Sequence, residues 1–374
     1  MPLRAQARVN LAAIERNVAR LRRELAPASA FCAVVKADGY GHGAAAAARA
    51  ALDGGAEWLA VASAQEAAEL RRAGIEQRVL VMGAISREEL PLAIEARADV
   101  VAWTTEFAQA SSGAAGPWPI RVHVKLDTGM GRLGTREVAE AFSVAERVAA
   151  ASPKLELAGA MTHFATADDD PSFLARQLVR FDPFAREVRR RWPSVVVHAA
   201  NSAATLRERS SHYDLVRCGI AIYGCDPMHD DPAVHGLEPV LELTSYVAAV
   251  KLARAGDSAG YGRRFIADRD TWIATLPIGY ADGIRRALTN NCEVLIGGRR
   301  YPLVGTVSMD NITVDLGPEP AARAGDRATI IGADGAERQT AEDLARRVGT
   351  ISYEILCGIS ARVPRTYHRD GAPA

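Results

Sequence analysis

The sequence predicts an α/β fold in which a (β/α)8 barrel, a TIM barrel, over residues 10–232 is followed by a mainly β domain over residues 238–374. Three observations predict this fold. Short runs of Val, Ile, Leu and Ala alternate with amphipathic stretches, this alternation repeats eight times, and the pattern changes near residue 238. Continuous apolar runs are typical of parallel strands covered on both faces, so eight strand–helix repeats over roughly 200 residues favour a closed barrel.

The first predicted element is a helix. Residues 11–25 place apolar side chains three and four residues apart, and Asn10 stands where an N-cap residue is expected. Farther along, residues 171–192 predict a long amphipathic helix whose apolar side consists of Leu174, Leu178, Phe181, Phe184, Val188 and Trp192.

The eight predicted barrel strands share the same apolar character. In chain order they are FCAVVKA (31–37), WLAVAS (58–63), RVLVMG (78–83), ADVVAW (98–103), IRVHVKLD (120–127), LELAGAMTH (155–163), VVVHAAN (195–201) and LVRCG (215–219). After a linker at 225–236, long helices give way to β runs separated by turns, which predicts hairpins. One helix near 341–348 interrupts this second domain.

Composition and charge exclude several classes of protein. Lys plus Arg equals Asp plus Glu, 45 each, so the zero net charge argues against bulk electrostatic binding to nucleic acid or to an acidic membrane. No apolar run approaches the ~20 residues of a membrane span, and the N-terminus lacks the apolar core of a signal peptide. We therefore expect a cytoplasmic protein. Five scattered cysteines without CxxC spacing argue against a disulfide framework and a zinc site, and predict buried reduced thiols.

Polar residues collect where the predicted strands end. In barrels of this kind the functional residues lie at the C-terminal ends of the strands. Two lysines, an arginine and a histidine converge on that rim, where burial is costly without partners. The residues at these strand ends are Lys36, Tyr40, Lys125, His163, Asn201, Ser202, Arg217, Gly219 and Ile220.

The chemistry that suits this rim is that of pyridoxal phosphate. No Ser-His-Asp order or metal-ligand spacing stands out. The loops after strands seven and eight of such barrels often bind phosphate, and here Ser202, Gly219 and Ile220 offer a hydroxyl and backbone N–H groups. A lysine at the end of a strand, such as Lys36, can form an imine with the aldehyde of the cofactor.

Motifs along nearly the whole chain resemble those of bacterial alanine racemases. AVVKADGYGHG (33–43) resembles the cofactor-lysine motif of that family. The further matching motifs occur in the family's order: VKLDTGMGRLG, HAANSAA, VRCGIAIYG, GYGRRF, LPIGYADG, VGTVSMDN and SYEILCGISARVPR. One difference is Cys218, which stands where the family commonly has proline and is expected to loosen that turn slightly; a reactive thiol there is conceivable.

The resemblance implies a pyridoxal phosphate enzyme that interconverts L-alanine and D-alanine, a peptidoglycan precursor, as a homodimer with shared active sites. It implies that residues 1–9 join the second domain, that Lys36 carries the cofactor and is one catalytic base, and that Tyr261 is the opposite base. Lys125 resembles a lysine that is often carbamylated. The implied cofactor-binding residues are Lys36, Tyr40, Arg132, His163, Asn201, Ser202, Arg217, Gly219, Ile220 and Tyr353, and the implied substrate-side residues are Arg132, Tyr280, Met309 and Asp310.

The proposed roles agree with elementary chemistry. Racemisation needs proton removal on one face of Cα and delivery on the other, so two bases are required. Lysine and tyrosine ordinarily titrate near pH ~10, so burial and positive neighbours must shift them. The resemblance implies that Arg217 meets the pyridine nitrogen of the cofactor. An arginine stays charged and cannot readily protonate that nitrogen, which weakens the electron sink and favours reprotonation at Cα over transamination.

Two alternatives stay open. The first is a racemase of another small amino acid such as serine. The second is a non-catalytic pyridoxal phosphate-binding protein, against which residues 238–374 with Tyr261 argue because that class has a single barrel. A decarboxylase of related fold would need an acidic partner for the pyridine nitrogen, and Arg217 argues against it. A role in cell-wall synthesis and a role in alanine breakdown fit the sequence equally.

Overall fold

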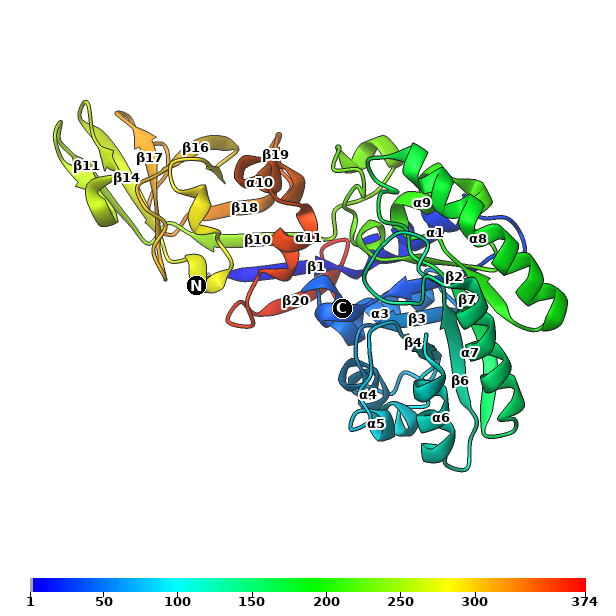
Figure 1. Cartoon of the computed structure of the whole chain (residues 1–374). Coiled ribbons are helices and arrows are strands. Elements are labelled where there is room, and N and C mark those ends of the chain that lie inside the picture. The colour runs from blue at the N-terminus through cyan, green and yellow to red at the C-terminus, as the bar shows by residue number, and fades with distance from the viewer. Residues whose placement is uncertain (1–2) are drawn as a thin grey trace. The chain divides into compact units, whose positions relative to one another are not determined.

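The computed structural model describes residues 3–374, which divide into two compact units (Figure 1). One unit comprises residues 14–39 and 43–222. The other comprises the described part of residues 1–13 together with 40–42 and 223–374. Each unit has its own core and is described separately.

The first unit is built on eight parallel strands. They are β2 (Ala30–Val34), β3 (Trp58–Val61), β4 (Arg78–Val81), β5 (Val100–Ala102), β6 (Ile120–Lys125), β7 (Leu155–Met161), β8 (Val196–His198) and β9 (Leu215–Cys218). Each lies within one of the predicted apolar runs, except that β2 begins one residue earlier, at Ala30, so the predicted barrel is confirmed. The strands are hydrogen-bonded in the order β4-β3-β2-β9-β8-β7-β6-β5. A parallel bridge between Leu80 and Asp99, just before β5, brings the two edge strands together and nearly closes the barrel.

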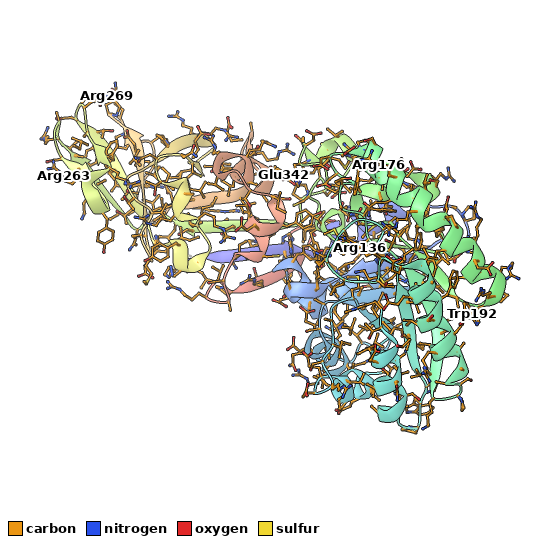
Figure 2. The ribbon with its side chains drawn as sticks, viewed as in Figure 1. Arg136, Arg176, Trp192, Arg263, Arg269 and Glu342 are labelled. Atoms are coloured by element: carbon orange, nitrogen blue, oxygen red, sulfur yellow. The ribbon has the colours of Figure 1, made fainter. Side chains whose placement is uncertain are left out.

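Helices follow the strands and surround them (Figure 1). They are α1 (Leu11–Arg22), α3 (Ala44–Asp53), α4 (Ala64–Arg72), α5 (Leu90–Glu95), α6 (Thr105–Ala114), α7 (Val138–Ala150), α8 (Pro171–Arg191) and α9 (Ser202–Arg207). Helix α8 buries its predicted apolar side from Leu174 to Val188. Figure 2 shows Arg176 and Trp192 near its opposite ends, and Trp192 follows the last helical turn and is only half-buried.

The role predicted for Asn10 differs in the structure. Asn10 directly precedes α1, as the sequence predicts, but it is also the last residue of β1 (Gln6–Asn10). Its amide side chain donates to the Asp370 carboxylate at 3.0 Å and accepts from the Asp370 backbone N–H at 3.1 Å. The hydrogen bonds to Asp370 therefore use the side-chain groups of Asn10 that would have capped α1.

The second unit is organised around a mixed sheet of eleven strands. The strand order is β11-β14-β17-β16-β15-β18-β10-β1-β20-β21, and β19 pairs with β18. Strand β1 lies antiparallel to β10 and parallel to β20, so N-terminal residues take part in the sheet. The bounds are β10 (Leu241–Tyr246), β11 (Ala249–Ala253), β14 (Thr271–Leu276), β15 (Glu293–Ile296), β16 (Arg299–Val304), β17 (Ile312–Gly317), β18 (Arg327–Asp334), β19 (Glu337–Gln339), β20 (Arg365–Arg369) and β21 (Ala372–Pro373).

Shorter elements complete the second unit. A separate two-stranded ribbon consists of β12 (Ser258–Ala259) and β13 (Phe265–Ile266), and two helices are present, α10 (Ala341–Val348) and α11 (Ser352–Cys357). Helix α10 is the helix expected near 341–348; it begins with a capping box between Thr340 and Asp343 and ends at Gly349 in the left-handed conformation. Figure 2 shows Glu342 on α10 and Arg263 at the β11–β14 end of the sheet.

The cysteines agree with the sequence analysis at four positions out of five. Cys32, Cys218, Cys225 and Cys292 are buried free thiols, whereas Cys357 is exposed. Cys357 is the last residue of the short helix α11, whose inward-facing residues are Ser352, Ile355 and Leu356, and this position turns its thiol to solvent. Among residues 3–374, no helix is long and apolar enough to cross a bilayer.

Candidate functional site

Lys36 lies two residues after the end of β2 and begins a turn of unusual backbone conformation. Ala37, Asp38 and Gly39 all have left-handed φ angles, of 52°, 51° and 61°. Such a conformation costs a residue other than glycine about 1–2 kcal/mol, so the turn needs support. The Glu66 carboxylate accepts from the Ala37 N–H at 2.7 Å, and the Asp38 carboxylate accepts from the Ala44 N–H at 2.7 Å. These contacts hold Lys36 at the carboxyl end of the strand, half-exposed at the rim.

Lys125, the last residue of β6, is a buried cation among other cations. Only 3% of it is exposed, and no carboxylate forms an ion pair with it among residues 3–374. Burial, with the charges of Arg217 and Arg132, lowers the pKa of its amine from 10.5 to about 8. The uncharged fraction of the Lys125 amine near neutral pH is therefore much larger than that of an exposed lysine.

The loop after β6 carries Arg132 and is organised by Asp127. One carboxylate oxygen of Asp127 accepts from the backbone N–H groups of Gly129 at 3.0 Å and Gly131 at 3.1 Å, and Arg136 donates to the other at 3.3 Å. Arg132 itself is exposed and is near enough to Lys125 to lower the pKa of that amine. A guanidinium at this place can bind a carboxylate through two parallel hydrogen bonds.

Arg217, on β9, is held by four hydrogen bonds inside the barrel. Its Nη1 donates to His198 Nδ1 at 2.8 Å. Its Nη2 contacts the carbonyl oxygens of Thr162 and Ala199, both at 3.0 Å, and His163 Nδ1 at 3.3 Å. The remaining donor, Nε, is buried and has no partner among the residues that the structure describes. A buried N–H without an acceptor is costly, so this group calls for a ligand acceptor.

His163 follows β7 and stays neutral. Burial, with the charges of Arg217 and Lys125, brings the pKa of its imidazole well below 6.5. Its contact with Arg217 Nη2 requires Nδ1 to be the acceptor, so Nε2 carries the proton.

The loops after β8 and β9 meet at Ser202. Asn201 is the N-cap of α9, where its side chain accepts from the Ala204 N–H at 3.0 Å. Ser202 Oγ accepts from the backbone N–H of Gly219 at 2.9 Å, and it is buried beside Ile220. The predicted phosphate-binding residues of the barrel are thus together, with one hydroxyl and several backbone groups in a small space.

Cys218 does not provide a reactive group. Its thiol is fully buried and contacts Thr205 Oγ1 at 3.4 Å, and burial raises its pKa to about 12. A thiol must be deprotonated to react, and this thiol stays protonated at neutral pH. The expectation of a reactive thiol at Cys218 is therefore wrong.

Tyr40 and Tyr353 lie together in the second unit. Their ring centroids are 5.9 Å apart, and Tyr40 packs on Tyr223 at 5.0 Å. Tyr40 itself has a left-handed φ of 53°. The two predicted phosphate ligands are therefore neighbours, fixed by a common aromatic cluster.

Tyr261 lies in a 3₁₀ turn after β12 and is 75% exposed. Its carbonyl accepts from Thr306 Oγ1 at 2.7 Å. Two residues farther along the chain, the Ser308 carbonyl accepts from the Tyr280 N–H at 2.9 Å. The segment after β16 thus ties the loop of Tyr261 to that of Tyr280.

Tyr280, Met309 and Asp310 form the other part of this surface. The Met309 carbonyl lies so close to Gly279 that a Cβ there would approach it to 2.4 Å, so only glycine permits the contact. Met309 and Tyr280 are 51% and 44% exposed, and Asp310 pairs with Arg362 at 2.7 Å. The second unit therefore presents the predicted base and substrate-side residues on exposed loops.

Three residues inside the barrel beneath Arg217 were not predicted from the sequence: Asp99, His123 and His198. All three are fully buried and linked by hydrogen bonds. A signal was present, because each histidine interrupts an otherwise apolar strand. The sequence could not show that the two strands place these rings in contact.

The described residues fit pyridoxal phosphate. The pyridine nitrogen of the cofactor is an acceptor and would accept a hydrogen bond from the buried Nε–H of Arg217. Lys36 offers an amine for the aldehyde, and the Ser202 hydroxyl, which accepts from the Gly219 N–H, can donate its own proton to a phosphate.

Comparison with known proteins gives the same family for both parts of the chain. Residues 9–227 match the family described as alanine racemase, N-terminal domain, and residues 240–367 match alanine racemase, C-terminal domain. Alanine racemase of Nostoc sp. is 39% identical over 97% of this chain and 95% of its own length. That of Symbiobacterium thermophilum is 42% identical, with 96% of each chain covered.

Solved structures show the same likeness. A crystal structure of alanine racemase from E. faecalis superposes with a TM-score of 0.91 at 36% identity, covering 97% of this chain and 98% of that one. The alanine racemase from Bacillus anthracis with bound L-Ala-P superposes with a TM-score of 0.90, also at 36% identity, covering 99% and 96%.

Proposed function

This chain belongs to the alanine racemase family, and we propose that it interconverts L-alanine and D-alanine with pyridoxal phosphate, using Lys36 and Tyr261 as bases on opposite faces of the substrate. One observation carries the assignment of the site. The buried Nε–H of Arg217 has no partner among the described residues, and it lies at the same rim as Lys36 and the Ser202 loop. Together these groups suit a single ligand that carries an acceptor nitrogen, an aldehyde and a phosphate. The division into a barrel over 10–232 and a β domain over 238–374 with residues 1–9 remains part of this proposal.

When bound, the cofactor supplies an electron-accepting ring that makes the Cα proton of the amino acid removable. Lys36 holds the cofactor and exchanges a proton at Cα from one face. Tyr261 exchanges a proton from the other face. Arg132 orients the substrate carboxylate, and Tyr280, Met309 and Asp310 bound the entrance. Tyr40, Tyr353, Ser202, Gly219 and Ile220 hold the phosphate, with Asn201 shaping that loop.

A panel assay tests the reaction itself. Purified protein with added pyridoxal phosphate is incubated with a set of L-amino acids, and formation of the D-enantiomer is followed by chiral chromatography. We expect alanine to give the highest kcat/KM. A higher kcat/KM for serine would favour the racemase of another amino acid, and the absence of any D-product would favour the non-catalytic cofactor-binding protein.

The electronic role of Arg217 leads to a specific prediction. Arg217→Glu places an acid beside the pyridine nitrogen, which strengthens the electron sink and prolongs the life of the deprotonated substrate. We expect slower racemisation and more pyridoxamine phosphate per turnover. An unchanged ratio of the two products would show that Arg217 does not contact the ring nitrogen.

The environment of Lys125 predicts a carbamate on its amine. Carbon dioxide reacts with an uncharged amine, and the pKa of about 8 makes that form more frequent than it is in an exposed lysine. The product is an anion, which can bind Arg132 by charge-assisted hydrogen bonds. In a 13C NMR spectrum with labelled bicarbonate, wild type should give a carbamate signal that disappears as the pH falls below the pKa, and Lys125→Arg should give none. A wild-type spectrum without that signal would contradict the modification.

We also propose a homodimer in which each active site takes Lys36 from one chain and Tyr261 from its partner. The exposure of Tyr261 supports this proposal, since a side chain that is 75% exposed in one chain is open to contact with a second chain. A mixture of Lys36→Ala and Tyr261→Ala chains, unfolded and reassembled together, tests it. A mixed dimer then has one intact site, and random mixing should restore roughly a quarter of the wild-type activity. Verified mixed dimers without activity would rule out shared sites.

We expect neither nucleic acid nor a membrane among the partners, and the cytoplasmic location remains a prediction.

A further inference from the structure

A continuous chain of buried side chains runs through the barrel from Arg217 to Asp99. Arg217 Nη1 contacts His198 Nδ1 at 2.8 Å, and His198 Nε2 contacts His123 Nδ1 at 2.8 Å. His123 Nε2 then contacts Asp99 Oδ2 at 3.0 Å. At its outer end the Asp99 carboxylate also accepts from Arg78 Nε at 2.8 Å and from Arg121 Nε at 2.5 Å. All three links lie within the barrel unit.

The two ends of this chain fix the direction of every hydrogen bond. A guanidinium only donates and a carboxylate only accepts. His198 must therefore accept at Nδ1 and carry its proton on Nε2, which it donates to His123 Nδ1. His123 in turn carries its proton on Nε2 and donates it to Asp99. Only one arrangement of protons satisfies all three contacts, with both rings neutral.

The electrostatics agree with neutral rings. Burial lowers the pKa of His123 despite the hydrogen bond to Asp99, and burial together with the charge of Arg217 brings the pKa of His198 well below 6.5. Burial alone would raise the pKa of the Asp99 carboxyl, but the hydrogen bond from His123 and the neighbouring arginines hold it below its ordinary value. An ionised Asp99 beside two neutral imidazoles is thus the stable state near neutral pH.

We propose that Asp99 is a positioning residue for the reaction: it fixes the tautomers of His123 and His198, so that His198 offers an acceptor to Arg217 and the guanidinium keeps its Nε directed to the cofactor. This inference rests on the proposed contact between Arg217 and the pyridine nitrogen. His198 is the partner of Nη1, since the other contacts of Arg217 are made by Nη2. If His198 carried its proton on Nδ1 instead, that N–H would face the Nη1–H of Arg217, and the guanidinium would have to move.

A purely structural role is the competing explanation. The backbone of Asp99 helps to close the barrel, because its carbonyl accepts from the Val81 N–H at 2.9 Å and its N–H donates to the Val79 carbonyl at 2.8 Å. Its carboxylate also forms ion pairs with Arg78 and Arg121. Substituting the side chain leaves the backbone bonds in place, and Arg121→Gln removes an outer ion pair without touching His123. Arg121→Gln is therefore the matched control.

The first measurement needs no catalysis. In protein labelled with 15N in its histidine rings, long-range proton–nitrogen correlations report which nitrogen carries the proton. Wild type should show His123 and His198 as neutral Nε2–H tautomers throughout the neutral pH range. Either ring in the Nδ1–H form, or doubly protonated near neutral pH, would overturn the proposal even if no variant folds.

The second measurement uses Asp99→Asn in the cofactor-loaded enzyme. Three donors then share one amide oxygen, so we expect some Nδ1–H tautomer at His123 and His198. We expect kcat to fall about ten-fold with KM for alanine nearly unchanged, and more pyridoxamine phosphate per racemisation. Arg121→Gln should keep the wild-type tautomers and product ratio. Equal changes in both variants, or unchanged tautomers in Asp99→Asn, would overturn the proposal. Altered tautomers with unchanged kinetics would also overturn the proposal, and the product ratio of Arg217→Glu tests the contact between Arg217 and the pyridine nitrogen separately.

Discussion

Replacing Lys36 by alanine is expected to abolish racemisation of alanine in both directions. Lys36 is proposed both to hold the cofactor and to exchange one of the two protons, so its removal eliminates a base whose loss alone costs about a thousand-fold. Folding should survive, because the side chain is half-exposed and the turn is held by backbone contacts to Glu66 and Asp38.

Two measurements check the Lys36 prediction. Chiral chromatography follows D-alanine formation from L-alanine and the reverse, with Lys154→Ala, an exposed lysine of the same unit, as the control. Borohydride reduction of the loaded wild-type enzyme followed by peptide mapping should place the cofactor on Lys36. A label on Lys125, or activity retained by Lys36→Ala, would show that the assignment is wrong.

Replacing Tyr261 by phenylalanine is expected to lower kcat for racemisation by about a thousand-fold. The change removes one oxygen from a ring that is 75% exposed, so stability should be unaffected and cofactor binding through Lys36 should persist. Tyr246→Phe, which alters a half-buried tyrosine of β10, is the control and should keep wild-type rates. Activity within a few-fold of wild type in Tyr261→Phe would remove this residue from the mechanism.

The fold was largely predictable because the barrel strands are short and mainly apolar. Strands such as Arg78–Val81 and Leu215–Cys218 are buried along almost their whole length, and such strands are rich in Val, Leu and other apolar residues. The errors come from contacts that are distant in sequence. Asn10 pairs with Asp370, 360 residues away, so nothing near Asn10 could indicate that its side chain was occupied.

The candidate site was predictable at its rim but not beneath it. Strand ends indicated Lys36, Lys125 and Arg217, since a charged residue closing an apolar run is visible in the sequence. The left-handed turn after Lys36 was not, because Ala37 and Asp38 seldom adopt that conformation and depend on Glu66 to support it. The direction of the hydrogen bonds below Arg217 was not predictable either. It depends on Arg217 and Asp99 together, and only the folded structure connects these two residues through His198 and His123.

The most direct test of the two-base account is Cα proton exchange in heavy water with Tyr261→Phe. With Lys36 as the remaining base, the account predicts that one enantiomer of alanine exchanges its Cα proton for deuterium without inversion, while the other exchanges far more slowly. Proton NMR of each enantiomer, incubated separately with the loaded variant, measures both rates. Equal exchange of the two enantiomers would mean that a single base serves both faces, and no exchange of either would mean that Lys36 is not a base; both results would contradict the account.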